Sequence, residues 1–367
     1  MAMSDLLRSP LHDRHERLGA KLADFGGWLM PIEYPEGGVL KEHAAVREHV
    51  GIFDVSHLGK MQVRGPGAAG FVNKQFTNDI TRIKPGHAQY SMLCNDSGGV
   101  VDDLIVYLRS DDDVFVIPNA GNTSTVVELL TAAAPSGISV VNQHQQFGVI
   151  AVQGPQATRV LTSLGLPVDL DYMAFVEVEW EGKPIVVCRT GYTGEHGYEL
   201  LPRWDDAGAL WDALMASAET LHGRPAGLGA RDTLRTEMGY PLHGQDLSPQ
   251  ISPVQARLGW AVGWSKPAFV GRDALDAEKE HGPARQLWGI KADDRGIPRP
   301  HMAVSDPIGS VVGEVTSGTF SPTLRQGIGL ALLDRRIQEG DAVQVDVRGR
   351  ASIMRVVKPP FVQPSTR

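Results

Sequence analysis

The order of predicted elements in the first 220 or so residues repeats, and this repeat limits the fold more than any other feature of the chain. Each copy has the pattern of a strand, a Gly-Pro break, a helix, three strands and a second helix. The Gly-Pro pairs at 65–66 and 154–155 are 89 residues apart (154 minus 65), and the Ile-Pro and Leu-Pro pairs at 117–118 and 201–202 are 84 apart (201 minus 117). Gly-Pro is a common pair, so coincidence is the alternative. The shared order favours two related βαβββα halves.

Apolar periodicity and Gly/Pro breaks place the individual elements. Ahead of the repeat, helices are predicted at 14–25 and 39–49. The first half is predicted to hold strands at 60–64, 89–94, 100–109 and 114–118, and helices through Phe71 and Phe76 and over 123–133. The second half is predicted to hold strands at 149–153, 175–180, 184–189 and 198–201, and helices through Val160 and Leu164 and over 204–218.

After Gly239 the pattern changes to short apolar runs between Gly-, Pro- and Asp-containing turns, which is typical of a small β-barrel or sandwich. A chain of 367 residues suits two to three domains at about 150 residues each. We therefore predict three domains: two α+β halves at 1–140 and 141–275, and a β-rich domain at 276–367.

The composition excludes several classes of protein. Lys and Arg number 35 and Asp and Glu 43, and a net charge of −8 gives no long-range attraction for nucleic acid or an anionic membrane. Two cysteines are too few for a disulfide framework or a Cys-rich zinc site. With no targeting sequence and no apolar run long enough to cross a bilayer, we expect a cytoplasmic protein with neither nucleic acid nor membrane as a partner. Residues 340–367 run against the average, with five basic and two acidic side chains.

Common catalytic motifs are missing from the sequence. Gly227-Leu228-Gly229 lacks the third glycine of a dinucleotide fingerprint, and neither a P-loop nor a Gly-x-Ser-x-Gly elbow occurs. His12 and His15 are one helical turn apart, but no third ligand lies nearby in the sequence, so a solvated helix face is the better interpretation. We expect no metal.

Three polar clusters lie where predicted strands end or a helix begins. In the first, residues 95–104, the adjacent carboxylates Asp102 and Asp103 point to opposite faces of a strand, so one faces inward. An inward carboxylate needs a partner or a task, and a turn-capping pair is the structural alternative. The second, residues 189–199, is a glycine-rich loop with interleaved Tyr, Thr and Glu side chains.

The third cluster, residues 227–239, opens a helix with Arg231 and Arg235 one turn apart. The alternative to a ligand-binding role for these arginines is ion pairing at the surface.

Together the three clusters suit a planar heterocycle with a carboxylated tail. A carboxylate accepts two N–H bonds from an aminopyrimidinone ring, an arginine binds a carboxylate, and tyrosines stack on the ring. The residues alone indicate a pocket between domains but no particular reaction.

These clusters and several short motifs resemble the T-protein family of the glycine cleavage system, and the resemblance covers essentially the whole chain. His196 departs from the family, which more often has an acidic residue there. The matching segments are residues 10–13, 25–28, 51–57, 98–103, 119–122, 153–155, 192–195, 229–232 and 316–322.

The resemblance implies an α+β fold with two ferredoxin-like α+β domains and a C-terminal β-barrel domain around a central folate channel. It implies aminomethyltransferase activity, with tetrahydrofolate as one-carbon acceptor and the lipoylated H-protein as partner. The implied catalytic residue is Asp103. The residues implied to bind substrate or folate are Glu199, Arg231, Asn119, Tyr192, Tyr90, Leu58 and Arg285.

Two other functions occur on this fold. One is a stand-alone tetrahydrofolate-dependent demethylase, and the other is a non-enzymatic folate-binding iron–sulfur assembly factor. The second group carries a Lys-Gly-Cys-Tyr-x-Gly-Gln-type loop, whereas this chain has Arg189-Thr190-Gly191-Tyr192-Thr193-Gly194-Glu195. The loop therefore disfavours the assembly factor, and the demethylase is the main alternative.

Overall fold

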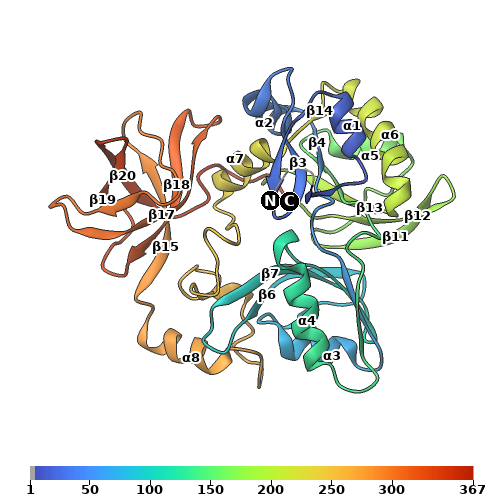
Figure 1. Ribbon diagram of the computed structural model, residues 1–367, viewed down its shortest axis with the longest axis horizontal. Helices are drawn as coiled ribbons and strands as arrows, with labels where there is room; N and C mark the ends of the chain where they lie inside the picture. The colour runs from blue at the N-terminus through green and yellow to red at the C-terminus, as the bar shows by residue number, and fades with distance from the viewer. Residues whose placement is uncertain (1–4, 367) are drawn as a thin grey trace.

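The two predicted halves form two sheets with matching connectivity (Figure 1). A computed structural model describes residues 5–366, so the outer limits of the first and third predicted domains, residues 1–4 and 367, lie outside it. The strand order is β6-β7-β8-β5-β9 in the first sheet and β11-β12-β13-β10-β4-β14 in the second. Each strand of the first sheet has a counterpart at the same place in the second, and β4 is inserted beside β10. The predicted duplication is confirmed.

The first unit packs α3 and α4 against its five-stranded sheet. Its elements are β5 (Met61–Arg64), α3 (Ala68–Gln75), η2 (Ile80–Arg82), β6 (His87–Cys94), β7 (Val100–Ser110), β8 (Asp113–Ile117), η3 (Ala120–Asn122), α4 (Thr123–Ala133) and β9 (Ser139–Asn142). The second unit uses β10 (Ile150–Gln153), α5 (Ala157–Ser163), β11 (Phe175–Trp180), β12 (Lys183–Cys188), β13 (Gly197–Pro202), η4 (Trp204–Asp206), α6 (Ala207–Glu219) and β14 (Arg224–Pro225).

The repeated Gly-Pro pairs mark the same turn in both units. Gly65 has φ +134° and Gly154 φ +132°, and each connects the first strand of its unit to the first helix. A Cβ atom on Gly65 would lie 2.0 Å from the carbonyl oxygen of Gly137. Only glycine tolerates both this backbone conformation and this close approach. Sequence and geometry therefore repeat together.

The N-terminal segment supplies the inserted strand and one correction. Its elements are β1 (Leu7–Arg8), α1 (His12–Arg17), β2 (Lys21–Phe25), β3 (Trp28–Glu33), α2 (Gly38–Glu48) and β4 (Gly51–Asp54). The predicted helix at 14–25 is wrong beyond Arg17, because residues 21–25 pair antiparallel with β3. Gly19, with φ +68°, ends the helix, and the apolar spacing that suggested a continuous helix also fits a strand.

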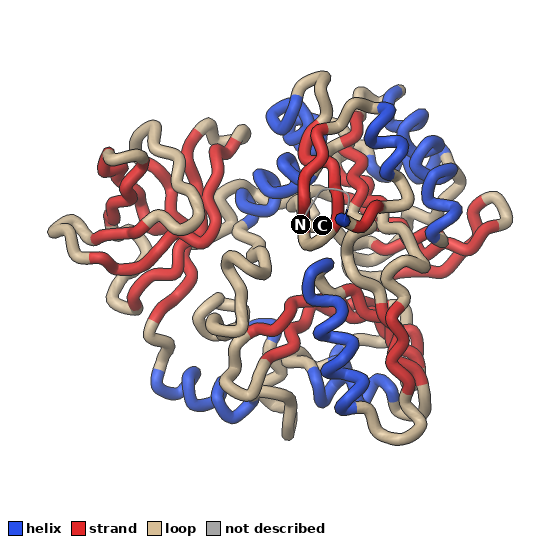
Figure 2. Tube along the Cα trace, in the orientation of Figure 1, coloured by secondary structure: helices blue, strands red, loops and turns tan. Residues whose placement is uncertain are grey.

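The predicted β-rich C-terminal region forms a closed six-stranded barrel in the order β15-β18-β17-β16-β19-β20. In Figure 2 it is a lobe of strands and loops. Its strands are β15 (Arg285–Ala292), β16 (Ala303–Ser305), β17 (Val311–Ser321), β18 (Gln326–Asp334), β19 (Ala342–Val347) and β20 (Arg350–Val357). Closure satisfies strand edges that would otherwise be open.

The two sheets face each other across a shared apolar core. Tyr107 and Phe115 of the first sheet pack in one cluster with Val186, Cys188 and Leu201 of the second. A long connection with α7 (Leu228–Met238), η5 (Gly259–Ala261) and α8 (Arg272–His281) joins the second sheet to the barrel. Figure 1 shows three lobes arranged around the centre of the molecule, with α7 between the second sheet and the barrel. The domain limits near residues 140 and 275 stay a prediction.

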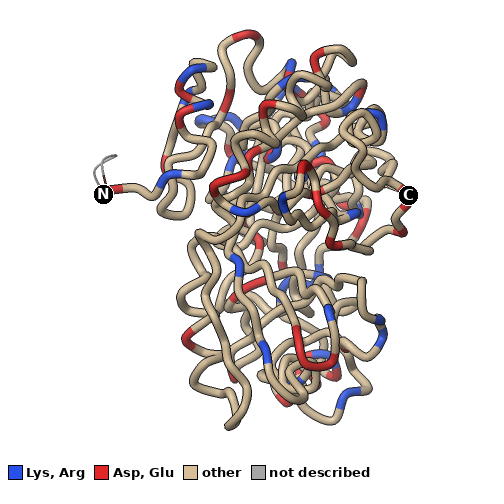
Figure 3. The backbone as a smooth tube through the Cα atoms, turned by 90° about the vertical axis from the view of Figure 1, so that its right-hand side faces the viewer, with Lys and Arg blue, Asp and Glu red and all other residues tan. Residues whose placement is uncertain are grey.

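Positive and negative residues are interspersed along the chain. In the view of Figure 3, Lys/Arg and Asp/Glu positions both occur throughout the molecule, and neither sign is confined to one lobe. Within residues 5–366, the structure contains no helix whose length and apolar character would let it span a bilayer.

Candidate functional site

The adjacent carboxylates Asp102 and Asp103 both accept hydrogen bonds from the side-chain amide of Asn119. They lie on opposite faces of β7, but Asn119 stands at the end of β8 and its Nδ2 donates to an oxygen of each carboxylate at 2.9 Å. The backbone N–H of Asn119 also donates to Asp102 at 3.0 Å. Asn122 donates to Asp102 at 2.6 Å, and the hydroxyl of Tyr90 donates to Asp103 at 3.0 Å. The pair is held by side chains from β6, β7 and the turn after β8.

Burial governs the protonation of this pair. Burial raises the pKa of Asp102, and the neighbouring charge of Asp103 raises it further. Burial also raises the pKa of Asp103, although His243 and the hydrogen bonds from Tyr90 and Asn119 oppose the shift. Two close buried carboxyl groups disfavour the doubly ionised state. The site can therefore hold or pass on a proton near neutral pH, as a general acid or base must.

A histidine distant in sequence completes the network around the carboxylates. His243 accepts from Asn122 through Nδ1 at 3.0 Å and donates from Nε2 to the carbonyl oxygen of Val100 at 3.0 Å. Asn122 thus links His243 to Asp102. We did not predict either residue from the sequence, because Asn122 resembles an ordinary helix cap and His243 stands in an irregular segment.

The glycine-rich loop after β12 positions an acidic side chain at the start of β13. Glu199 is only 9% exposed and accepts a hydrogen bond from the hydroxyl of Thr190. In the sheet, Glu199 pairs with Ala151 on β10 and with Cys188 on β12. A nearly buried carboxylate with one side-chain donor has free acceptor capacity for ligand N–H groups.

The third cluster places a cation between the other two. The guanidinium carbon of Arg231, on α7, lies 4.7 Å from the ring centroid of Tyr192, and its Nη1 is buried without a hydrogen-bond partner among the described residues. Burial lowers the pKa of Arg231, whereas the charge of nearby Glu199 opposes this. Burial raises the pKa of Tyr192, and Asp103 adds to this. These interactions bring Asp103, Tyr192, Arg231 and Glu199 into one region.

Of the two remaining predicted residues, Leu58 lies beside this region and Arg285 lies on the barrel. Leu58 follows His57, whose pKa is lowered to about 3 by burial and by the charge of Arg231, so the turn at 56–58 lies beside the same region. Arg285 is exposed at the first position of β15 and pairs in register with Asp334 on the barrel. The structure does not draw Arg285 into the hydrogen-bonded cluster, and its role stays a prediction.

The far end of α7 attaches the barrel to the site. Glu237 is fully buried and accepts from Arg47 at 2.7 Å, from Ser321 at 2.5 Å and from Thr323 at 3.0 Å. Two residues earlier, Arg235 forms a buried ion pair with Asp246 at 2.9 Å. These two charged groups fix α7, and therefore Arg231, against the barrel. The surface ion pairing proposed as an alternative for this helix does not describe its buried end.

The region combines paired carboxyl groups, a cation with a free donor, a free carboxylate acceptor and tyrosine rings. Among the described residues, no group of three or more His, Cys, Asp or Glu side chains is arranged to hold a metal ion. The chemistry available is proton transfer and recognition of a polar heterocycle.

Comparisons with known proteins agree over the full length. The family model of the GCVT N-terminal domain matches residues 11–266, and that of the glycine cleavage T-protein C-terminal barrel domain matches residues 285–363. An aminomethyltransferase of Parafrankia sp. is 66% identical over 365 residues, which is 100% of both chains. That of Mycobacterium tuberculosis (strain H37Rv) is 59% identical over 99% of each. The crystal structure of glycine cleavage system aminomethyltransferase T from Bartonella henselae has a TM-score of 0.92 at 35% identity, over 98% of this chain and 99% of that one.

Proposed function

This chain belongs to the glycine cleavage T-protein family and is an aminomethyltransferase of that system, and we propose that Asp103 and the groups around it form its reaction centre. The observation that supports this assignment is the Asp102–Asp103 pair held by Asn119, in which Asp102 is buried and Asp103 half-buried. The demethylase and iron–sulfur assembly alternatives are not favoured, because full-length relatives are aminomethyltransferases.

The proposed substrates are tetrahydrofolate and the aminomethyl group carried on the dihydrolipoyl arm of the H-protein. A folate amine attacks the carbon that bridges sulfur and nitrogen, ammonia leaves, and attack by the second folate amine releases the thiol. The products are 5,10-methylenetetrahydrofolate, ammonia and the reduced arm. The family supports this assignment of substrates and partner, and the chain's lack of a basic excess is consistent with a cytoplasmic enzyme that does not bind nucleic acid.

Asp103 is suited to the charge that develops in this reaction. An iminium-like cation develops as the sulfur leaves the carbon that by then carries the folate nitrogen, and a carboxylate shielded from solvent stabilises such a cation more strongly than water does. The same group accepts the proton that the attacking folate nitrogen loses. The hydrogen bonds from Tyr90 and Asn119 hold its oxygens in place before substrate binds.

Asp102 has a supporting part in this proposal. It receives three hydrogen bonds from Asn119 and Asn122, which use most of its acceptor capacity. It orients the amide that also holds Asp103, and its proximity raises the cost of ionising the pair. Asp102 is therefore a positioning residue.

The remaining residues would recognise the folate. Glu199 would accept N–H bonds from the aminopyrimidinone edge of the pterin, and Arg231 would use its unpaired Nη1 for a ligand carbonyl or carboxylate. Tyr192 and Tyr90 would contact the ring system, with Asn119 and Leu58 beside them. Arg285, at the first position of β15, would contact the ligand from the barrel side.

Substitution of the two aspartates separates their roles. Asp103→Asn should lower kcat by about a hundred- to ten-thousand-fold, the usual contribution of a positioned acid–base group. Asp102→Asn should lower it far less. The assay measures methylenetetrahydrofolate formation with and without aminomethylated carrier, so that carrier-independent turnover is also detected. Equal losses in the two variants would contradict the assignment.

Folate recognition by Glu199 is tested by binding alone. Glu199→Gln keeps the size of the side chain but removes the charge that strengthens N–H bonds, so the dissociation constant for tetrahydrofolate should rise about ten-fold or more. Titration calorimetry measures this, with Glu128→Gln on the exposed side of α4 as a control. Unchanged affinity in the Glu199 variant would exclude the pterin role.

A further inference from the structure

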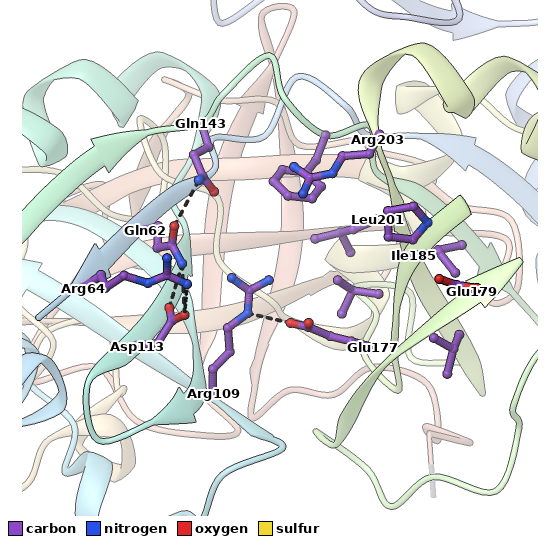
Figure 4. Close-up of a pocket in the computed structure, with 14 residues that line it drawn as sticks. Gln62, Arg64, Arg109, Asp113, Gln143, Glu177, Glu179, Ile185, Leu201 and Arg203 are labelled. Carbon is purple, nitrogen blue, oxygen red and sulfur yellow. Dashed lines mark hydrogen bonds and ion pairs between the residues drawn. The ribbon is translucent and has the colours of Figure 1, made fainter. Parts of the chain in front are cut away.

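A polar cleft lies between the two sheets (Figure 4). Asp103 and Glu199 lie at the opposite end of the core that the two sheets share. The volume of the cleft is about 510 Å³, within the range of small-molecule sites. Strand alternation fixes its position: Asp103 and Arg109 share one face of β7, Glu199 and Leu201 share one face of β13, and Arg203 follows directly after β13 ends. Six residues of strand separate Asp103 from Arg109, or about 20 Å at 3.3 Å per residue. The cleft is therefore a separate site.

Two arginines point into the cleft, and each guanidinium group lies over one of two phenylalanine rings that pack against each other. The guanidinium carbon of Arg109 lies 4.8 Å from the ring centroid of Phe115, and that of Arg203 lies 4.5 Å from that of Phe147. The two phenyl rings pack edge to face at 5.7 Å. Cation–π contacts restrict the conformations of both guanidinium groups before any ligand binds. Both phenylalanine rings belong to the buried core, so they hold the two guanidinium groups in fixed positions.

Neither guanidinium is saturated. Arg203 is exposed and has no ion-pair partner among residues 5–366. Arg109 has its Nε 2.7 Å from Glu177 Oε1, but this Nε has no aligned hydrogen bond, and the Glu177 side chain is 57% exposed. Because the Glu177 carboxylate lies at the surface, a ligand carboxylate can replace it beside Arg109. The cleft thus offers two planar donors for an anion.

The wall that faces Arg203, formed by the first unit, offers an acceptor that lacks a donor (Figure 4). Gln62 Nε2 donates to both oxygens of Asp113, which leaves Gln62 Oε1 to accept from Gln143 Nε2 at 3.1 Å. This chain of bonds fixes the orientation of the Gln143 amide. Its Oε1 is buried without a hydrogen-bond partner among the described residues. An unpaired buried acceptor is costly and is satisfied by a ligand N–H.

We propose that this cleft binds a small acidic amino acid, with its two carboxylates on Arg203 and Arg109 and its ammonium group on Gln143 Oε1. An anion without an amine would leave Gln143 unpaired, and an amine without a carboxylate would leave the guanidinium groups unpaired. The site therefore discriminates in favour of molecules that carry both charges.

Titration calorimetry on the full chain tests this proposal, with tetrahydrofolate at saturation so that the probe does not occupy the folate site. L-glutamate should bind saturably, glutarate at least ten-fold more weakly, and n-propylamine not measurably. Arg203→Gln should weaken L-glutamate binding by ten-fold or more, and Arg159→Gln on exposed α5 should not. Gln143→Leu should weaken L-glutamate binding but leave glutarate unchanged.

Three results would overturn the proposal: no saturable binding, equal binding of glutarate and L-glutamate, or binding unaffected by Arg203→Gln. Thermal unfolding of each variant by circular dichroism confirms that the chain remains folded, since Arg203 is exposed and its replacement removes no buried contact other than that with Phe147. The readout is binding alone. A failure here is therefore distinguishable from a failure of the proposed catalytic assignment, which is measured by turnover.

Discussion

Neutralising Glu237 should loosen the attachment of α7 to the barrel, with a stability loss that depends on pH. Burial by itself raises the pKa of this carboxyl group, but hydrogen bonds from His43 and Ser321 and the charges of His43 and Arg47 outweigh it and lower the pKa to about 2. The ordinary value is 4.5. At 1.36 kcal/mol per pKa unit, the difference corresponds to about 3 kcal/mol in favour of the folded state.

The sign of the pH dependence follows from the lowered pKa. A group whose pKa is lower in the folded state stabilises the protein above its unfolded pKa and loses that effect as pH falls toward the folded pKa. Glu237→Gln should therefore lower the free energy of unfolding by about 3 kcal/mol at pH 7 and by about 1.4 kcal/mol at pH 3. The loss of one partner of a buried ion pair with Arg47 has a comparable magnitude.

Urea unfolding followed by circular dichroism at the two pH values measures the effect. With a denaturant slope near 3 kcal/mol/M, the midpoint at pH 7 should fall by about 1 M. Glu128→Gln on α4 is the matched control, because that side chain is exposed and should leave the midpoint unchanged. A gap between wild type and Glu237→Gln that is the same at pH 7 and pH 3 would refute the reasoning, since the charge would then contribute nothing.

Two further outcomes are expected. Lys266 is buried and its Nζ donates to the carbonyl oxygens of Phe76 at 2.6 Å and Asn78 at 3.0 Å, so Lys266→Met should cost about 2 kcal/mol in thermal unfolding; exposed Lys74→Met should cost nothing, and equal melting of the two would exclude the role. Replacing exposed Arg348 and Arg350 together by Glu should raise the KM for the carrier but not for folate, if the basic C-terminal segment helps hold the carrier; an unchanged carrier KM would remove that hypothesis.

Elements set by local patterns could be predicted from the sequence. The helix at 123–133 is found with those limits, and β7 differs from its prediction by one residue at its end. In both, a run of apolar residues with one clear period is bounded by turn residues. The segment at 14–25 failed because Leu18, Leu22 and Phe25 fit a helical spacing, whereas Gly19 takes a left-handed conformation and breaks it. Pairing of 21–25 with β3 then overrides the local pattern.

Long-range contacts could not be predicted in this way. The insertion of β4 beside β10 depends on a partner about a hundred residues away, and the contact of His243 with Val100 joins residues 143 apart. The local sequence pattern carries no signal of such contacts, since neither partner is unusual among its neighbours in the chain. The alternation along β7 did predict that Asp102 and Asp103 lie on opposite faces. It did not predict that Asn119, at the end of the neighbouring strand, reaches both.

The duplication explains why polar groups lie at both ends of one apolar core. Two sheets of the same connectivity face each other, so side chains on the inner face of each strand either enter the core or emerge at one of its ends. Along β7 the inner face passes from Asp103 through Ile105 and Tyr107 to Arg109, and from β13 onward it passes from Glu199 through Leu201 to Arg203. Each strand thus presents a carboxylate at one end and a guanidinium group at the other. Since the residues between them are packed, the core separates the charges at the two ends. Substitutions in the cleft lined by Arg109 and Arg203 should therefore leave the geometry around Asp103 unchanged.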